Sequence, residues 1–112
     1  MIDDVAPGGV EQAIKDADTF FEIELPALGE WAFGPDQAKA IGQPVLSVVG
    51  SDSEAVFVEG RDLLHSWFPQ TEDFTLDGAG HLLQAQRPGP LAQALAEFVI
   101  RHPVSRVPVT AA

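Results

Sequence analysis

The side chain best suited to chemistry is the imidazole of His81, which ends the glycine-rich turn 77–81 (DGAGH). The preceding residues 72–76 alternate between polar and apolar types, so they are predicted to form a short strand. His81 should then lie at the carboxyl end of that strand, where ligands bind in open α/β sheets. Gly78 and Gly80 permit the backbone conformations that aim a side chain over the sheet edge. An imidazole titrates near neutral pH and can serve as general base and then general acid. A loop histidine without a chemical task is the alternative, and the local pattern favours neither.

A carboxylate that might orient such an imidazole follows an earlier apolar run, at residues 51–54 (SDSE). Asp52 and Glu54 are the acidic residues of this turn. The same four residues fit the S-x-x-E capping box that begins many helices, and negative charge there suits the helix dipole. We weight the capping role above a catalytic role for Asp52.

Other catalytic or ligand-binding patterns are weak. The chain has no cysteine, which removes thiolate metal sites and cysteine nucleophiles. Its histidines, at positions 65, 81 and 102, fall in different predicted elements with no carboxylate at zinc-site spacing. His65 and His102 are predicted to be structural. The Gly-Ala-Gly stretch lacks the remaining residues of a phosphate-binding loop. We therefore expect no metal and no cofactor.

The composition predicts one acidic globular domain. The chain has 112 residues, of which 46% are hydrophobic, and its 17 acidic and 6 basic residues give a formal charge of -11. This field repels nucleic acid and anionic membrane surfaces, so neither is an expected partner. The first residues (MIDD) lack the basic and apolar regions of a secretory signal, and no segment is long enough to cross a bilayer. A cytoplasmic location is the expectation.

The elements that would position His81 follow from hydrophobic periodicity and from Pro and Gly breaks. A β-branched apolar run such as PVLSVV suits a strand covered on both faces of a parallel sheet. The strand–helix–strand segment predicts a right-handed crossover with parallel strands, hence an α/β fold. Two strands are too few for a stable open sheet, so one edge of the apolar strand lacks a partner. The predicted elements are helices over 10–31 with a restart at Pro26, a helical turn over 36–40, strands over 44–49 and 72–76, and helices over 55–68 and 88–102.

The apolar residues of the final helix set its predicted orientation. Leu91, Leu95, Phe98 and Val99 form a stripe that should face the sheet. The tryptophans and phenylalanines of the chain also fall mostly on predicted inward faces, which favours core packing over an aromatic binding site. The tail over 104–112 is expected to be frayed.

Together, PVLSVVG, a helix ending in WFP, an edge strand, DGAGH and a helix led by Gln-Arg-Pro resemble the last two strand–helix units of the α/β-hydrolase fold. In that family the catalytic triad runs Ser, then Asp or Glu, then His, with the histidine in a loop after the last strand. The matching position is His81. Residues 10–40 resemble the end of the family's cap region, and the resemblance spans residues 10–103. It implies one partial domain, with a helical cap remnant (1–43), the two strand–helix units (44–103) and a flexible tail (104–112).

Two departures from the family pattern limit what the chain is expected to do alone. The acid usually stands three residues past a strand-end glycine, and counting from Gly50 that position is Ser53. Asp52 and Glu54 flank it but miss the register. No serine lies in the G-x-S-x-G pattern that exposes the nucleophile, and the oxyanion-hole loop has no counterpart. Without these groups the isolated chain is predicted to be inactive.

The resemblance implies the histidine-bearing C-terminal fragment of a serine hydrolase that acts, when complete, on ester-like small molecules. Cap aromatics would then line an apolar substrate pocket, although the same residues would serve equally well as core. These are Phe20, Phe21, Trp31 and Phe33. The expected partners are a small apolar or ester-like ligand, and either a missing N-terminal half or a second copy of the chain. The alternative is a non-enzymatic binding or self-associating module that uses the exposed strand edge.

Overall fold

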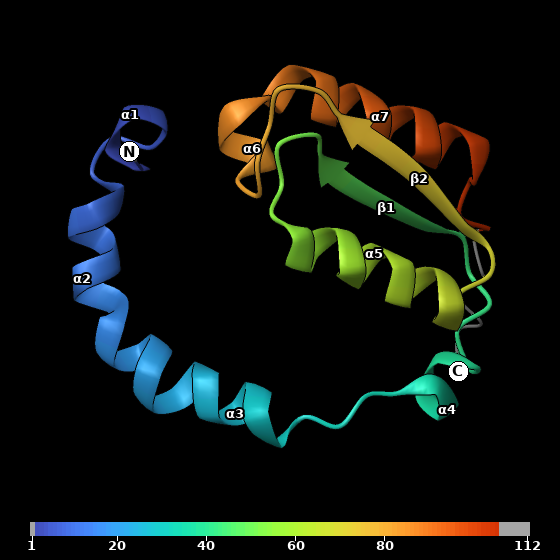
Figure 1. Ribbon diagram of the computed structural model, residues 1–112, viewed down its shortest axis with the longest axis horizontal. Coiled ribbons are helices and arrows are strands. Elements are labelled where there is room, and N and C mark those ends of the chain that lie inside the picture. Colours follow the sequence, from blue (N-terminus) through green and yellow to red (C-terminus); the bar gives the residue numbers. More distant parts are fainter. Residues whose placement is uncertain (1, 106–112) are drawn as a thin grey trace, which may run out of the picture.

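The computed structural model describes residues 2–105 and places a strand pair between two helices, with a helical arm to one side (Figure 1). The elements in chain order are α1 (Ile2–Val5), α2 (Gly9–Thr19), the π-helix η1 (Phe20–Glu24), α3 (Leu25–Glu30), α4 (Pro35–Ala38), β1 (Val45–Gly50), α5 (Ala55–Trp67), β2 (Thr71–Leu76), α6 (Leu83–Gln86) and α7 (Pro88–Arg101). The short helices α1 and α6 were not anticipated from the sequence.

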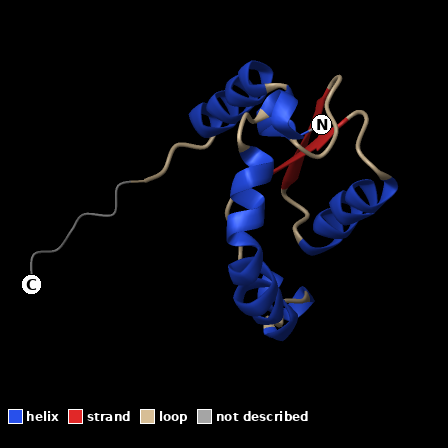
Figure 2. Cartoon of the chain, turned by 90° about the vertical axis from the view of Figure 1, so that its left-hand side faces the viewer, coloured by secondary structure: helices blue, strands red, loops and turns tan. Residues whose placement is uncertain are grey.

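The two strands are parallel, as predicted, and they make the fold α/β. Val45 pairs with Thr71 at one end of the register and Gly50 with Leu76 at the other. Helix α5 makes the crossover between them, and α5 and α7 lie on opposite sides of the strand pair (Figures 1 and 2). Both strands end at the same edge of the sheet, so the turns that follow them are neighbours.

Within residues 2–105, strand β1 pairs with β2 along one edge, and its other edge has no partner strand. Its sequence is almost entirely apolar, and Ser47 in its middle is 6% exposed. Such a strand is typical of the interior of a parallel sheet, where both edges are paired and both faces are covered. The free edge of β1 therefore carries unpaired backbone groups next to apolar side chains.

The restart predicted at Pro26 takes the form of a π-helical turn. Pro26 has no amide hydrogen, and in a regular α-helix its ring would collide with the carbonyl of Glu22 four residues earlier. The backbone widens just before it: the amide of Leu25 donates to the carbonyl of Phe20, five residues back. Helices α2 and α3 are thereby joined through η1 into one continuous arm.

The apolar face of this arm is uncovered. Ile14, Phe21, Leu28 and Trp31 are each more than 60% exposed. Figure 1 shows the arm running beside the sheet and its helices without lying on them. The expectation that Phe20, Phe21 and Trp31 are core residues is therefore wrong for this chain, because no element of residues 2–105 packs against this face of the arm.

Helix α7 faces the sheet through a narrower stripe than predicted. Ala94 is 7% exposed, whereas Leu95 is 45% and Val99 is 58% exposed. Leu91, Ala94 and Phe98 follow the spacing of one helical face, and the strand against which α7 packs is β2. A helix that covers a single strand buries one row of side chains, so the second row, with Leu95 and Val99, faces solvent.

The core is small for 112 residues. The buried apolar residues of the described chain are Ala38, Phe68, Leu76, Ala79 and Ala94. Leu76 is the one large side chain among them that is fully enclosed. The radius of gyration is 17.5 Å, against about 13 Å for a compact chain of this length. The accessible surface of 8603 Å² likewise exceeds the roughly 6,000 Å² expected for 11.9 kDa.

No helix in residues 2–105 is both long and apolar enough to span a bilayer. Most of the tail predicted to fray, residues 106–112, lies outside the described residues.

Candidate active site

The turn that carries His81 sits directly on the end of β1. A Cβ atom added at Gly50, the last residue of β1, would lie 2.0 Å from the carbonyl oxygen of Ala79. Ala79 is completely buried at this contact. Gly78 has a φ of 71°, in the left-handed region that favours glycine. The two glycines therefore let the turn fold back on the strand end.

Hydrogen bonds join this turn to the turn that follows β1. The Ser51 amide donates to the Leu76 carbonyl at 2.9 Å, and the Gly78 amide donates to Ser51 Oγ at 2.9 Å. The Asp52 amide donates to the Ala79 carbonyl at 3.0 Å. The two strand ends are thus tied to one another through both backbone and side chain.

A further bond fixes the turn from its other side. The Gly80 amide donates to Oε1 of Gln86 at 2.8 Å, and Gln86 ends helix α6. The backbone immediately before His81 is therefore held both by the 50–52 turn and by α6.

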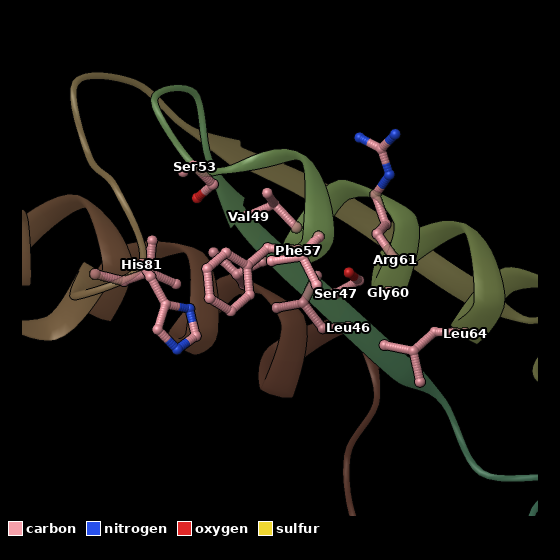
Figure 3. A pocket seen from close by; sticks show the side chains of 13 residues that line it. Leu46, Ser47, Val49, Ser53, Phe57, Gly60, Arg61, Leu64 and His81 are labelled. Carbon is pink, nitrogen blue, oxygen red and sulfur yellow. The ribbon is translucent and has the colours of Figure 1, made fainter.

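The imidazole of His81 is exposed and stacks on the ring of Phe57 from the first turn of α5. The ring centroids are 3.8 Å apart and the planes differ by 9°. Both rings lie at one end of a groove of about 480 Å³ between β1 and α5 (Figure 3). Within residues 2–105 no carboxylate bonds to this imidazole, so its ring nitrogens are available at the groove.

The carboxylate of Asp52 contacts its own turn. Its Oδ1 accepts a long hydrogen bond of 3.4 Å from Ser51 Oγ, and Asp52 does not line the groove. Ser53, at the position that the family pattern gives to the acid, does line the groove together with His81. A catalytic role for Asp52 stays a prediction.

The capping box predicted for residues 51–54 does not form. The N-cap of α5 is Glu54, and it makes no side-chain capping bond. Ser51 instead accepts the Gly78 amide. The hydroxyl that the sequence pattern assigned to the helix is used to hold the histidine turn, because parallel pairing brings the two strand-end turns together.

The four predicted substrate contacts fall into two groups away from His81. Phe20 and Phe21 pack edge to face at 5.0 Å on η1, beside a separate groove of the arm. Trp31 and Phe33 are 5.4 Å apart, and Phe33 continues to Trp67 of α5 at 5.8 Å. None of the four lines the His81 groove. Their role as substrate contacts stays a prediction.

The other two histidines fasten helices to β2. His65 of α5 bonds to Asp73 at 2.7 Å, and His102, at the end of α7, bonds to Glu72. Arg101 adds a 2.8 Å bond to the same Glu72 carboxylate. The hydrogen bond from His102 is the largest cause that holds the pKa of Glu72 below its ordinary value, and the hydrogen bond from Arg101 is the second. These pairs join elements, as expected for structural histidines, and within the described residues no cluster of three metal-ligating side chains occurs.

Sequence reasoning missed three contributors to the site: Phe57, Ser51 and Gln86. The sequence predicts that Phe57 faces inward with most of the other aromatic residues, that Ser51 belongs to a helix cap, and that Gln86 leads the final helix. The glycine at the end of the strand, Gly50, was the one sequence signal for this contact, because a glycine in a strand often marks a place where another backbone segment approaches closely.

Two curated proteins show distant similarity to this chain. One is an uncharacterized hydrolase, YugF, of Bacillus subtilis (strain 168), 29% identical over 65 residues, which are 58% of this chain and 24% of that protein. The other is a probable alcohol acetyltransferase of Saccharomyces cerevisiae (strain ATCC 204508 / S288c), 29% identical over 75 residues, which are 67% of this chain and 21% of that protein. The matched part spans less than a quarter of each relative's length. No family model and no solved structure matches the chain.

Proposed function

We propose that this chain is the histidine-bearing C-terminal part of an α/β-hydrolase-type acyl-transfer enzyme, with His81 as the triad histidine. The observation that carries the proposal is the position of His81. A turn tied to two parallel strand ends presents its exposed imidazole at the carboxyl edge of the sheet, beside an apolar groove. Open α/β folds bind their ligands at this edge.

In a complete enzyme His81 would take the proton of a serine hydroxyl while the serine oxygen attacks an ester carbonyl. The same imidazole would then give this proton to the leaving alcohol, and a second acceptor would release the acyl group. Water as acceptor makes the enzyme a hydrolase, and an alcohol makes it a transferase. The names of the two relatives, a hydrolase and an acetyltransferase, correspond to these two acceptors.

The isolated chain should be inactive, because neither a nucleophile elbow nor an oxyanion loop occurs in its sequence. Hydrolysis of a generic aryl ester by the purified chain should equal hydrolysis by a His81→Ala variant. A rate for the unmodified chain well above that of the variant would show that this chain has catalytic machinery of its own.

A chimera tests the positive part of the proposal. The matched segment of the Bacillus subtilis hydrolase is replaced by this chain's segment, and aryl-ester hydrolysis is measured. We expect activity that His81→Ala lowers at least a thousandfold, the scale of losing a triad member. His65→Gln, a change at a histidine that does not line the groove, is the control and should retain activity. A folded, active chimera that tolerates His81→Ala would refute the assignment.

A second candidate function, self-association, rests on the free edge of β1. Unpaired backbone groups on the edge of an apolar strand can hydrogen-bond to another strand, and β1 of a second copy of the chain could supply that strand. Size-exclusion chromatography with light scattering measures the mass directly. A folded monomer at all concentrations would count against this function and leave the assignment of His81 untouched.

A further inference from the structure

The imidazole of His81 and the ring of Phe57 belong to two separately anchored pieces of backbone. Phe57 lies in the first turn of α5, where its amide donates to the Glu54 carbonyl at 3.0 Å. His81 follows the turn that is bonded to residues 51 and 52 and to Gln86. The stacking contact is therefore a consequence of how two fixed segments meet, and neither ring belongs to a loop without backbone anchors.

The two rings are stacked at close range. A centroid separation of 3.8 Å with planes 9° apart places the rings face to face at van der Waals contact. The close-up shows the two side chains next to one another at one end of the groove (Figure 3). An exposed histidine would otherwise exchange among several side-chain rotamers. Contact with Phe57 favours the one in which the rings overlap.

Stacking leaves the chemistry of the imidazole open. Both ring nitrogens donate or accept protons in the plane of the ring, and the phenyl ring covers a face, not an edge. The imidazole can thus be held in one plane while its nitrogens stay accessible. Fixing a proton-transfer group before substrate arrives removes orientational entropy from the reaction barrier.

We propose that Phe57 is a positioning residue for His81, which sets the plane of the imidazole at the groove through face-to-face stacking. The contact itself does not depend on any activity, whereas its value for catalysis rests on the function proposed for His81. Phe57 would act through the imidazole and would not touch the reacting atoms.

Proton NMR of the purified chain tests the contact. In the unmodified chain the carbon-bound ring protons of His81 should be displaced upfield by the phenyl ring current and should show cross-relaxation with Phe57 ring protons. Phe57→Leu should abolish the upfield displacement and let the His81 side chain exchange among several rotamers, which would average its Hα–Hβ couplings. Phe57→Tyr keeps the ring and should restore both properties.

Phe74→Leu is the matched control, because it removes a phenyl ring from β2, on the side of the sheet near α7. It should leave the His81 signals unchanged. Absence of Phe57–His81 cross-relaxation in the folded, unmodified chain would overturn the inference, whether or not Phe57→Leu folds. So would a Phe57→Leu protein with native amide signals and unchanged His81 resonances. Retained activity in the chimera carrying His81→Ala would refute the proposed function and leave the Phe57–His81 contact untouched, so the two failures are distinguishable.

Discussion

At the scale of single residues, Gly50 shows how closely the histidine turn approaches the sheet. The backbone of Ala79 and Gly80 occupies the place where a side chain at position 50 would begin, and backbone atoms cannot give way as a flexible side-chain end can. The position of the histidine turn therefore depends on the lack of a side chain at Gly50, which lies in a different strand from the one that leads into the turn.

We expect Gly50→Ala to lower the free energy of unfolding by about 3 kcal/mol, because the new methyl group collides with the carbonyl of Ala79. Gly60→Ala is the matched control: Gly60 lies inside α5 and its added Cβ would meet open space. That change should stabilise by roughly 1 kcal/mol through helix propensity. Urea denaturation of both variants gives the two values, and equal stabilities would contradict the close approach.

The identity of the triad acid is also decided at single residues. Ser53 lines the His81 groove, whereas the Asp52 side chain bonds within its own turn. In the chimera, Ser53→Asp should raise aryl-ester hydrolysis roughly tenfold or more, because a carboxylate there can orient the imidazole. Asp52→Asn should leave the rate nearly unchanged. A large loss on Asp52→Asn would instead identify Asp52 as the acid.

At the scale of elements, β2 holds the helices of both sides through neighbouring residues. Glu72 bonds to the end of α7 and Asp73 to α5, which is possible because successive side chains of a strand point to opposite faces. The two carboxylates at the start of β2 therefore fix the helices that flank the sheet, and the carboxyl end of the strand is left for the histidine turn.

The lowered pKa of Glu72 predicts how this fastening responds to acid. A carboxyl whose pKa is lower in the folded state than in the unfolded state stabilises the fold above its ordinary pKa of 4.5. That stabilisation is lost as the pH falls through the folded value. Glu72→Gln should therefore flatten the decline of stability from about pH 5 downward, as measured by urea denaturation at several pH values.

Glu97→Gln is the control for this titration. Glu97 lies on the same helix as Arg101, and within residues 2–105 its hydrogen-bond partner is Gln93, one turn away on the exposed side. Its replacement should leave the acid dependence of stability as it is in the unmodified chain. An acid profile of Glu72→Gln identical to that of the unmodified chain would show that the Glu72 contacts contribute nothing to folding.

At the scale of the whole molecule, the chain exposes apolar surface on its arm and beside the free edge of β1. Ile14, Phe21 and Trp31 of the arm face solvent, and the free edge of β1 lies beside an apolar groove. Complete domains bury such surfaces in a single core. The matched segments make up less than a quarter of the two relatives' lengths.

We expect the purified chain to bind a hydrophobic fluorescent dye strongly and to unfold in urea with a smaller m-value than complete domains of 112 residues, because unfolding exposes less new surface. Dye fluorescence and the slope of the denaturation curve measure the two properties. Gly60→Ala serves as a folded control with the same exposed arm and should behave alike. A steep transition without dye binding would mean that the chain buries these residues in solution.

Local pattern alone determined much of the fold. The apolar run PVLSVV, the break at 50–54 and the Pro-led final helix predicted β1, α5, β2 and α7 within two residues, because chain periodicity and breakers act over short distances. The parallel direction of the strands followed from the crossover helix, and the placement of His81 after the last strand followed from chain order. The extra turns α1 and α6 are too short for a periodic signal.

Tertiary structure alone decided which groups meet. The use of Ser51 by the Gly78 amide, the contact of Gly50 with Ala79 and the stack of Phe57 on His81 join residues 24 to 29 positions apart. The exposure of the arm, of Leu95 and of Val99 was equally hidden, since a helical stripe shows which side is apolar and not whether anything covers it. Whether an apolar face is buried depends on which other elements pack against it, and the periodicity of one segment does not contain that information.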